Sequence, residues 1–540
     1  MIYQSPISNL QFLSVVHSSS MQQACSSCST DFAVEDADLA ILEKASPRIG
    51  DSTLTIPPPK LCPSCRMQRR LVFRNQQTLY RRKCDSSGKP IISIYSPDKD
   101  QVVYSPDEWW SDKWDPFSFG KDLDLNRSFF EQFKELMRSV PHIGVLLSNV
   151  QNSDFTNQSY GTKDCYLSSA IKDCDSVLYT QNSNNLTDCT DVSYCFHSEL
   201  LYESTDTYDS YGSTGAFHCI NCSDCVFVHD CVGCKNCFGC TGLRQQEYHF
   251  YNEPLKKEEY EQRKQEYALH TSEGLEKARS DFVDFLRKTE HRTDFTLQCE
   301  NVVGNNIRNS RNCVECYDSL DLEDCRYSTW IFGCKDAGDC YGMGDSQVVY
   351  DCVGVEEVQQ VAFSFGTSNS HDCYYTDLCF DCSHCFGCVG LRNKEYCILN
   401  KEYSADEYNK LVPQLVAKME QEGEWGEFFP AQVSAFAYNE SKAQEVYPLT
   451  KEQALQKGYS WKDDIDDVPK SEKVVPGERL PSSIEDIPDD ILNWAIECQE
   501  TGRPYRLTKG ELEFYRHRRL PVPRLHHDVR LKRRIEMRDV

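Results

Sequence analysis

The sequence predicts a mainly β protein that contains two tight β-solenoids with three-residue inward periodicity. In residues 150–243 every third residue is small or apolar, at 32 successive positions, and all eleven cysteines of 165–240 fall on these positions. The same register returns over 29 positions in residues 307–391, where the cysteines of 313–388 are again in phase. A repeat of this regularity indicates a repeat architecture, so we interpret it before any chemical motif.

The period of three excludes the ordinary elements. A helix buries residues at spacings of three and four in alternation, and a strand buries every second residue. Polyproline II also repeats every three residues, but these blocks are not rich in proline or glycine. A narrow β-solenoid fits if each short side turns one residue inward, and inward Cys, Ser, Thr and Ala imply a thin core. Four or six triplets per coil fit equally well.

The residues on either side of the inward position support this interpretation. Asp or Asn often precedes it, as at Asp164 and Asp188, and both residue types suit turns and left-handed backbone. Aromatic residues such as Phe196 and Phe238 follow it and are expected to stack on the outside. The spacing resembles the cysteine- and serine-lined β-solenoids of some insect antifreeze proteins, a likeness of architecture and not of activity.

The 30 cysteines and the net charge of −26 bear on where the protein resides and on what it can bind. The sequence shows no convincing secretory signal and no run long enough to span a membrane, so we expect a cytoplasmic protein with reduced thiols. The solenoid cysteines are then small buried hydrophobic residues. The alternative is that stacked thiols bind Cu(I), zinc or an iron–sulfur cluster. Diffuse negative charge argues against a surface that coats nucleic acid.

The N-terminal region, residues 21–90, is predicted to be a zinc ribbon. Cys25 and Cys28 form one Cys-x-x-Cys pair, and Cys62 and Cys65 form a second pair after the spacer 29–61. Two such pairs present four thiolates to one tetrahedral Zn²⁺ and leave no position for a catalytic water, so we expect one structural site. Cys84 is a spare thiol in this scheme.

A basic stretch follows the second pair and is the candidate nucleic-acid contact. The segment 66–83 contains no acidic residue, and its basic residues are Arg66, Arg69, Arg70, Arg74, Arg81, Arg82 and Lys83. These side chains are in a position to reach phosphates while the zinc fixes their backbone. The alternative is that they pair with the 84 acidic residues of the chain itself.

The C-terminal region, residues 491–540, is predicted to be a degenerate copy of this ribbon. Cys498 and His526 occupy two of the four ligand positions, whereas Thr501 and Val529 occupy the other two and cannot complete a tight zinc site. We therefore expect a ribbon-like fold without metal, in which Cys498 and His526 are the relic of a lost site.

The remaining segments complete the organisation. Three tryptophans in residues 109–114 are expected to form core between modules, although they are also suited to stacking on nucleobases or a partner. The predicted regions are a disordered tail 1–20, the zinc ribbon 21–90, an aromatic and helical connector 91–145, β-solenoid I 146–245, a helical connector 246–298, β-solenoid II 299–395, a helical cap 396–462, a linker 463–490 and the degenerate module 491–540.

The two solenoids end alike, which indicates an internal duplication. Residues 237–252 read CFGCTGLRQQEYHFYN and residues 385–400 read CFGCVGLRNKEYCILN, with ten of sixteen positions shared at an offset of 148. Together with LCPSCRMQRRLVFRNQQTLYRRKCDSSGKPIISIYSP and WWSDKWDP, the repeated CFGCxGLR resembles a poorly characterised cysteine-rich zinc-ribbon family of candidate-phyla (Patescibacteria) bacteria. The resemblance covers most of the chain from about residue 24, and it implies no activity.

No catalytic motif is present: the sequence has no phosphate-binding loop, dinucleotide-binding glycine motif, HExxH or Gly-x-Ser-x-Gly. The leading hypothesis is a non-catalytic zinc-binding scaffold whose basic terminal modules contact RNA, a nucleoprotein or a protein partner. A soft-metal storage or thiol redox protein is the first alternative, and an unrecognised enzyme is the second. No membrane partner and no small-molecule substrate is indicated. The sequence does not identify the partner or the oligomeric state.

Overall fold

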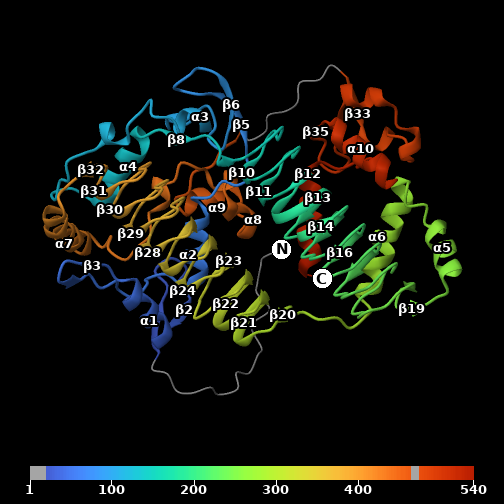
Figure 1. Ribbon diagram of the computed structural model, residues 1–540, viewed down its shortest axis with the longest axis horizontal. Coiled ribbons are helices and arrows are strands. Elements are labelled where there is room, and N and C mark those ends of the chain that lie inside the picture. Colours follow the sequence, from blue (N-terminus) through green and yellow to red (C-terminus); the bar gives the residue numbers. More distant parts are fainter. Residues whose placement is uncertain (1–19, 464–472, 540) are drawn as a thin grey trace. The chain divides into compact units, whose positions relative to one another are not determined.

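The computed structural model describes residues 20–463 and 473–539, which form two compact units. Unit 1 combines Met1–Gly144 with Asp294–Ile465, and unit 2 combines Val145–Thr293 with Asp466–Val540. Each unit therefore contains one solenoid and the terminal module from the opposite end of the chain (Figure 1). The predicted disordered tail lies almost entirely outside the described residues, as do residues 464–472, in the first part of the predicted linker.

Solenoid I lies in unit 2 and follows the predicted period. Its strands pair in parallel, with the residue four triplets later as partner, as in Asn157 with Ser169 and Thr214 with Val226. One coil is therefore four triplets, which settles the choice between four and six. The strands are β9 Leu147–Ser148, β10 Asn157–Tyr160, β11 Ser169–Lys172, β12 Asp175–Leu178, β13 Gln181–Ser193, β14 Phe196–Glu199, β15 Tyr202–Thr205, β16 Thr214–Phe217 and β17 Val226–His229, before the terminal hairpin β18 His249–Phe250 and β19 Glu253–Pro254.

Solenoid II lies in unit 1 and has the same coil of four triplets, except at its start. Glu300 pairs with Arg311, and the register shifts at Gly304, so the first coil is one residue shorter and lies out of phase with the rest. The strands are β20 Thr296–Leu297, β21 Glu300–Arg308, β22 Arg311–Leu320, β23 Thr329–Phe332, β24 Lys335–Gly338, β25 Tyr341–Gly344, β26 Gln347–Tyr350, β27 Val353–Glu356, β28 Gln359–Ala362, β29 His371–Tyr374, β30 Ser383–Phe386 and β31 Glu395–Ile398, with β32 Lys401–Glu402 as a terminal hairpin strand.

The corners of the coils are made by single residues in the left-handed conformation, directly before the inward residue. Asp164, Asp173 and Asp188 have φ of 52°, 52° and 49°, and the same sign recurs at nearly every third residue of both solenoids. Asn, Asp and Gly adopt this conformation most readily, which explains the prediction that Asp or Asn precedes the inward position. Leu167 adopts it as well, so the hydrogen bonds between coils enforce the corner where the residue type does not favour it.

The inward side chains are small because they complete the hydrogen bonding of the backbone. Where the preceding coil carries an inward hydroxyl or thiol, that group can accept the inward N–H of the next coil. Ser183 Oγ accepts the N–H of Cys195 at 3.0 Å and donates to the carbonyl of Gln181 at 2.9 Å. Cys189 acts in the same way, accepting the N–H of Leu201 at 3.4 Å. Both serine and cysteine can therefore accept the buried N–H of the next coil, whereas alanine cannot.

Each solenoid ends in an asparagine that imitates one further coil. The side-chain amide of Asn252 accepts from the N–H of Thr241 at 3.0 Å and donates to its carbonyl at 2.9 Å. Asn400 makes the same pair with Val389, at 2.8 and 2.7 Å. These asparagines are the last letters of the duplicated sixteen-residue motif, so the motif encodes the end of the solenoid.

Helices follow each solenoid, as the predicted connector and cap require. Solenoid I is followed by α5 Lys257–Glu266 and α6 Ser272–Leu286, and Phe282 of α6 stacks on Phe227 of a coil, with ring centroids 6.0 Å apart. Solenoid II is followed by α7 Ala405–Glu422, whose apolar side joins the last coil in the core of unit 1, and then by α8 Lys442–Val446 and α9 Lys451–Gln456.

The terminal modules supply the rest of each unit. The N-terminal part of unit 1 contains β1 Met21–Ala24, β2 Asp31–Val34, α1 Asp36–Ala45, β3 Arg48–Ile49, β4 Ser52–Thr53, α2 Pro63–Leu71, β5 Tyr80–Lys83, β6 Pro90–Ser93, β7 Val103–Tyr104, α3 Pro106–Trp109, α4 Phe129–Ser139 and β8 His142–Ile143. Unit 2 ends with β33 Val474–Pro476, β34 Ala495–Glu497, β35 Pro504–Tyr505, α10 Lys509–Arg518 and α11 His527–Glu536. Because β33 pairs with β34, the C-terminal module begins inside the segment predicted to be a linker.

Of the three tryptophans expected in the core, Trp109 is buried there. Trp109 is fully buried, donates its indole N–H to the carbonyl of Pro141 at 2.9 Å, and lies 5.7 Å from the ring of Phe380. Trp114 packs on Trp109 with ring centroids 5.6 Å apart. Trp110 is partly exposed. The cluster thus joins the connector to solenoid II.

The hydrogen-bond role of the inward side chains can be tested at Ser183. We expect Ser183→Ala to lower the free energy of unfolding by about 1–3 kcal/mol, because the buried N–H of Cys195 loses its acceptor. Ser183→Cys is expected to cost less, because a thiol serves this purpose at Cys189. Urea denaturation of the two variants and the parent measures both effects. Equal losses in the two variants would show that side-chain volume, and not hydrogen bonding, selects these residues.

Candidate metal centre and its docking helix

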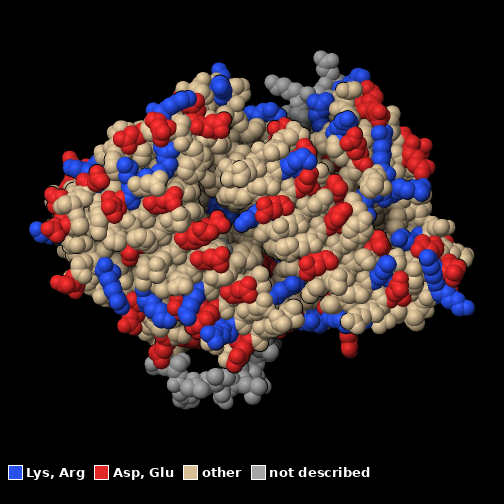
Figure 2. Space-filling model, in the orientation of Figure 1, with Lys and Arg blue, Asp and Glu red and all other residues tan. Residues whose placement is uncertain are grey.

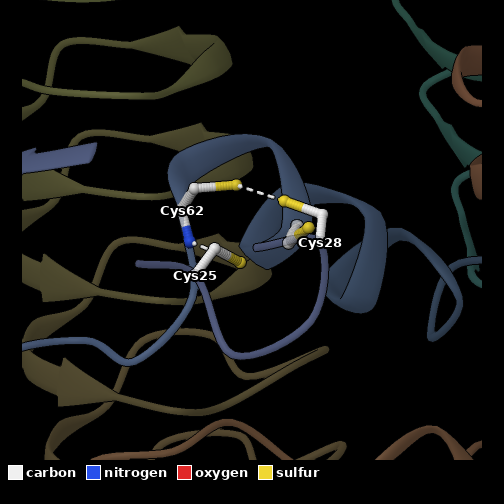
Figure 3. A group of neighbouring side chains, drawn as sticks. Cys25, Cys28 and Cys62 are labelled. Atoms are coloured by element: carbon white, nitrogen blue, oxygen red, sulfur yellow. Dashed lines mark hydrogen bonds between the residues drawn. The ribbon is translucent and has the colours of Figure 1, made fainter. Parts of the chain in front are cut away.

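The four predicted zinc ligands converge in the structure. One ligand atom from each of Cys25, Cys28, Cys62 and Cys65 lies within 4.8 Å of the others. The sulfurs of Cys28 and Cys62 are 3.8 Å apart (Figure 3). A tetrahedral ion with Zn–S bonds of about 2.3 Å requires sulfurs about 3.8 Å apart, so the four thiols fit Zn²⁺. The structure thus supports a metal site at this cluster.

Two local motifs position the thiols. The first pair lies in the turn between β1 and β2, where Ser29 has a φ of 62° and its N–H bonds to the carbonyl of Cys25 at 2.9 Å. The second pair begins helix α2: Cys62 is the N-cap, Pro63 is the first helical residue, and Cys65 follows in the first turn. Proline at this position is pre-organised for a helix start and has no N–H group to leave unpaired.

The environments of Cys25 and Cys62 favour the thiolate form. Burial alone would raise the pKa of Cys25, but the N–H groups of Cys28 and Cys62 help to outweigh it and lower that pKa. The N–H of Cys62 lies 3.3 Å from the sulfur of Cys25 (Figure 3). A hydrogen bond from Cys65 lowers the pKa of Cys62 to about 5, and the same pair raises the pKa of Cys65. Bound Zn²⁺ would replace these shared protons and hold all four thiolates.

The arginines of α2 face the protein and not the solvent. Arg66 forms an ion pair with Asp339 at 2.9 Å, and Arg70 forms one with Asp351 at 2.6 Å. Arg69 joins Asp351 at 2.7 Å and Glu427 at 2.8 Å. The Arg70 and Asp351 side chains are fully buried. Although burial alone would lower it, these carboxylates raise the pKa of Arg70.

The predicted nucleic-acid contacts therefore need correction. The guanidinium of Arg74 lies 5.0 Å from the ring centroid of Tyr341. Arg74 is buried, as are Arg66 and Arg70, and Arg69 is nearly buried. Arg82 pairs with Asp85 at 2.9 Å and is largely buried. Among the seven predicted contacts, the side chains at the surface are Arg81 and Lys83 on strand β5. Arg66, Arg69, Arg70 and Arg82 instead pair with acidic residues of the chain itself, which was the alternative that the sequence offered.

The acids that receive the arginines are corner residues of solenoid II. Asp339 and Asp351 occupy the same corner on successive coils, with φ of 60° and 49°. Arg66 and Arg70 lie one helical turn apart and so share one face of α2. The guanidinium of Arg66 also lies over the ring of Tyr327, at 5.4 Å. The zinc ribbon thus docks on solenoid II through a ladder of ion pairs.

The C-terminal module docks on solenoid I in the same way. Arg530 and Arg534 of helix α11 pair with Asp191 at 3.3 and 2.7 Å, and Arg530 lies 4.6 Å from the ring centroid of Tyr179. Asp191 and Tyr179 correspond to Asp339 and Tyr327 at the offset of 148 that relates the duplicated solenoid ends. Arg530 therefore contacts solenoid I as Arg66 contacts solenoid II. The second contact differs, because Arg534 shares Asp191, whereas Glu203, the counterpart of Asp351, pairs with Arg279 of α6.

The C-terminal ribbon keeps its turns without the four ligands. The N–H of Gly502 bonds to the carbonyl of Cys498 at 2.8 Å, as in the zinc knuckle. His526 is the N-cap of α11 and its Nδ1 accepts the N–H of Asp528 at 3.2 Å. Burial lowers the pKa of His526 to about 3, so the ring is neutral. His526, His527 and Asp528 lie close enough to hold an ion, but they do not form a four-ligand set with Cys498 among the described residues.

A third ribbon turn, at Cys84, was not predicted from the sequence. The N–H of Gly88 bonds to the carbonyl of Cys84 at 2.8 Å, between the hairpin strands β5 and β6. The N–H of Ser105, the N-cap of α3, lies 3.3 Å from the Cys84 sulfur, as that of Cys62 does from Cys25. The sequence signal is Cys-x-x-Ser-Gly followed by Ser-Pro, where the zinc ribbon has Cys-x-x-Cys-Ser and Cys-Pro. Cys84 lies outside the four-cysteine cluster, as predicted, but its turn has the geometry of a ribbon turn.

The solenoid thiols act as hydrogen-bond donors to the backbone. Cys165 Sγ lies 3.3 Å from the carbonyl of Lys163, and Cys174 Sγ lies 3.3 Å from that of Lys172. Burial raises the pKa of Cys165 to about 11 and that of Cys174 to about 12, so these sulfurs hold their protons. Among the described residues, the groups whose ligand atoms lie mutually close include none of the solenoid cysteines.

Comparison with protein-family models and with curated proteins finds no match to this sequence. The resemblance to the cysteine-rich zinc-ribbon family therefore stays a prediction. Within the described residues no helix is both long and apolar enough to cross a membrane.

The identity of the ligands can be tested by metal content. We expect one zinc ion per chain that withstands exhaustive dialysis under anaerobic conditions, and we expect Cys62→Ser to lose it, because three thiols cannot close the tetrahedral site. Cys84→Ser is the matched control, since Cys84 lies in the same kind of turn outside the cluster. Elemental analysis of the three proteins gives the zinc content. Retention of zinc in Cys62→Ser, or its loss in Cys84→Ser, would contradict the assignment.

Proposed function

We propose that this protein is a non-catalytic, zinc-stabilised scaffold that presents the open faces of two β-solenoids to a protein partner. The observation that carries the proposal is the ladder from zinc ligands to solenoid acids. Helix α2 begins at Cys62, carries Cys65 in its first turn and then inserts Arg66 and Arg70 between acidic corners of solenoid II. A metal at the cluster would fix the start of this helix and, through it, the docking of the ribbon.

The solenoid faces that the terminal modules leave uncovered suit a partner. In solenoid I one column of side chains recurs once per coil and remains largely exposed; it runs through Lys163, Asp175, Thr187, Glu199, Tyr211, Ser223, Lys235 and Glu247. Successive members lie about 4.8 Å apart, the spacing of neighbouring strands. Acidic and basic side chains are interspersed on the face drawn in Figure 2, as expected of a surface for protein recognition rather than for phosphate.

A reducing compartment such as the cytoplasm is part of this proposal. The 30 cysteines of the chain are free thiols in the structure. Those of the solenoids donate their S–H protons to carbonyls, as Cys165 and Cys174 do. A disulfide has no S–H group, so oxidation would leave these carbonyl groups without their thiol donors. Reduced thiols are the rule inside cells.

Soft-metal storage is the second candidate, and one observation favours it. Each solenoid has one coil whose four inward residues are all cysteine: Cys231, Cys234, Cys237 and Cys240 in solenoid I, and Cys379, Cys382, Cys385 and Cys388 in solenoid II. A hydrogen bond from Cys379 lowers the pKa of Cys382 to about 4. Several Cu(I), zinc or iron equivalents per chain, where the scaffold hypothesis expects one tight zinc, would favour storage.

The link between zinc and docking can be tested at Asp351. We expect Asp351→Asn to lower the free energy of unfolding by about 3–5 kcal/mol, because Arg70 is left buried without its nearest carboxylate. We also expect a chelator to remove zinc faster, because α2 loses its anchor. Asp381→Asn, at an exposed corner of the same solenoid, is the control for both measurements. Unchanged stability and unchanged zinc release would show that docking does not depend on the ion pairs.

The choice between a protein and an RNA partner can be tested by filter binding at two salt concentrations. We expect no salt-dependent binding of single-stranded or duplex RNA, because Arg66, Arg70 and Arg74 are occupied within the protein. Salt-dependent binding that is lost in the double variant Arg81→Glu and Lys83→Glu would instead assign RNA recognition to the exposed end of strand β5.

A further inference from the structure

A second group of metal-ligating side chains lies on the outside of solenoid II, on strands β29 and β30 (Figure 1). His371, Asp372 and His384 each offer one ligand atom, and these atoms all lie within 4.8 Å of one another. Nδ1 of His371 is 3.2 Å from Oδ2 of Asp372, and Nδ1 of His384 is 3.7 Å from the same oxygen. The three side chains are partly exposed, so an ion can reach them from solvent.

The coil places these residues together although Asp372 and His384 are separated in the sequence. The two residues occupy the same corner of successive coils, and both have a φ of 52°. His371 precedes this corner and pairs with Ser383 on the next strand. The rigid spacing of the coils, about 4.8 Å, therefore sets the separation of the ligands.

The geometry fits a divalent ion of the first transition row. Bonds of about 2.0–2.1 Å from nitrogen or oxygen to Zn²⁺ require tetrahedral ligand atoms about 3.3–3.4 Å apart. The two distances from imidazole nitrogen to Oδ2 of Asp372 lie on either side of that value. Nδ1 of His384 is buried and makes no hydrogen bond. The ring is held edge-on against Tyr396, with centroids 4.7 Å apart, so this nitrogen stays directed at the group.

We propose that His371, Asp372 and His384 bind one divalent transition-metal ion, of the Zn²⁺ class, with solvent in the remaining coordination positions. Two imidazoles and a carboxylate suit Zn²⁺, Co²⁺ and Ni²⁺, whereas Ca²⁺ and Mg²⁺ prefer oxygen ligands throughout. The site differs in kind from the four-thiol cluster: it is open and exchangeable, and it lies on the outer face of the solenoid.

Solenoid I supplies a comparison inside the same chain. At the offset of 148 its equivalent residues are Ser223, Asp224 and Asn236, so it keeps the carboxylate and lacks both imidazoles. The substitutions His371→Ser and His384→Asn therefore convert the site to side chains that the same fold already carries at these positions. Asparagine also tolerates the left-handed corner well, so the double variant is expected to fold.

The experiment is a titration of the zinc-loaded protein with Co²⁺. We expect one equivalent to bind and to give visible d–d absorption without a thiolate-to-cobalt charge-transfer band, because nitrogen and oxygen ligands replace sulfur. The His371→Ser and His384→Asn double variant is expected to lose this equivalent while it keeps its tight zinc. His197→Asn is the matched control, an exposed histidine at a left-handed corner of solenoid I, and it is expected to bind as the parent does.

Three results would overturn the proposal. Binding of no Co²⁺ by the zinc-loaded parent would mean that His371 and His384 serve only as hydrogen-bonding partners of Asp372. An unchanged equivalent in the double variant, or one that carries a thiolate charge-transfer band, would place the second ion elsewhere in the chain.

Discussion

The structure depends on one constraint: a coil of four three-residue sides encloses so little space that its inward side chains are small, and many of them also bond the backbone of the next coil. An inward N–H points at the neighbouring inward side chain, as that of Thr180 does at Ser168 Oγ, at 3.1 Å. Only Ser, Thr and Cys combine small volume with both a donor and an acceptor. Valine, leucine and alanine fill the sites between them, where van der Waals contact suffices. The abundance of cysteine follows from this requirement and needs no metal to explain it.

A thin core cannot dominate the stability of the units, and the docked modules complete them. Buried ion pairs such as Arg70 with Asp351 cost desolvation, so their main contribution is to fix where a helix docks. The solenoid makes this possible because it holds Asp339 and Asp351 one coil apart, a spacing that two arginines one helical turn apart can match. In unit 2, Arg530 and Arg534 both pair with the single acid Asp191, and they hold the C-terminal module without a complete set of zinc ligands. A metal at the four-cysteine cluster would thus act on docking only through the start of α2, whereas the ion pairs act on it directly.

The sequence predicted what repeats and what has local spacing. The inward period, the two Cys-x-x-Cys pairs and the duplicated solenoid ends each depend on residues near one another in the chain, and the structure has all three. The coil length remained open because four and six triplets both keep the period of three. The ion-pair partners of Arg66 and Arg70 could not be predicted either, because in the sequence Asp339 and Asp351 do not differ from the other corner aspartates of the solenoid. Only the assembly of unit 1 from distant segments identifies them as partners.

The three ribbon turns and the two solenoids show how function can change on such a scaffold. The turn at Cys498 keeps its backbone hydrogen bonds where Thr501 and Val529 replace ligands, so the fold of a ribbon does not require the ion once other contacts hold it. Conversely, the exposed corners of a coil, away from the docked helices, carry little of the fold, because their side chains leave the core hydrogen bonds untouched. Residues such as His371 and His384 are thus free to differ from Ser223 and Asn236. The same architecture therefore accommodates different sets of potential ligands at the ribbon turns and at the exposed corners of the coils.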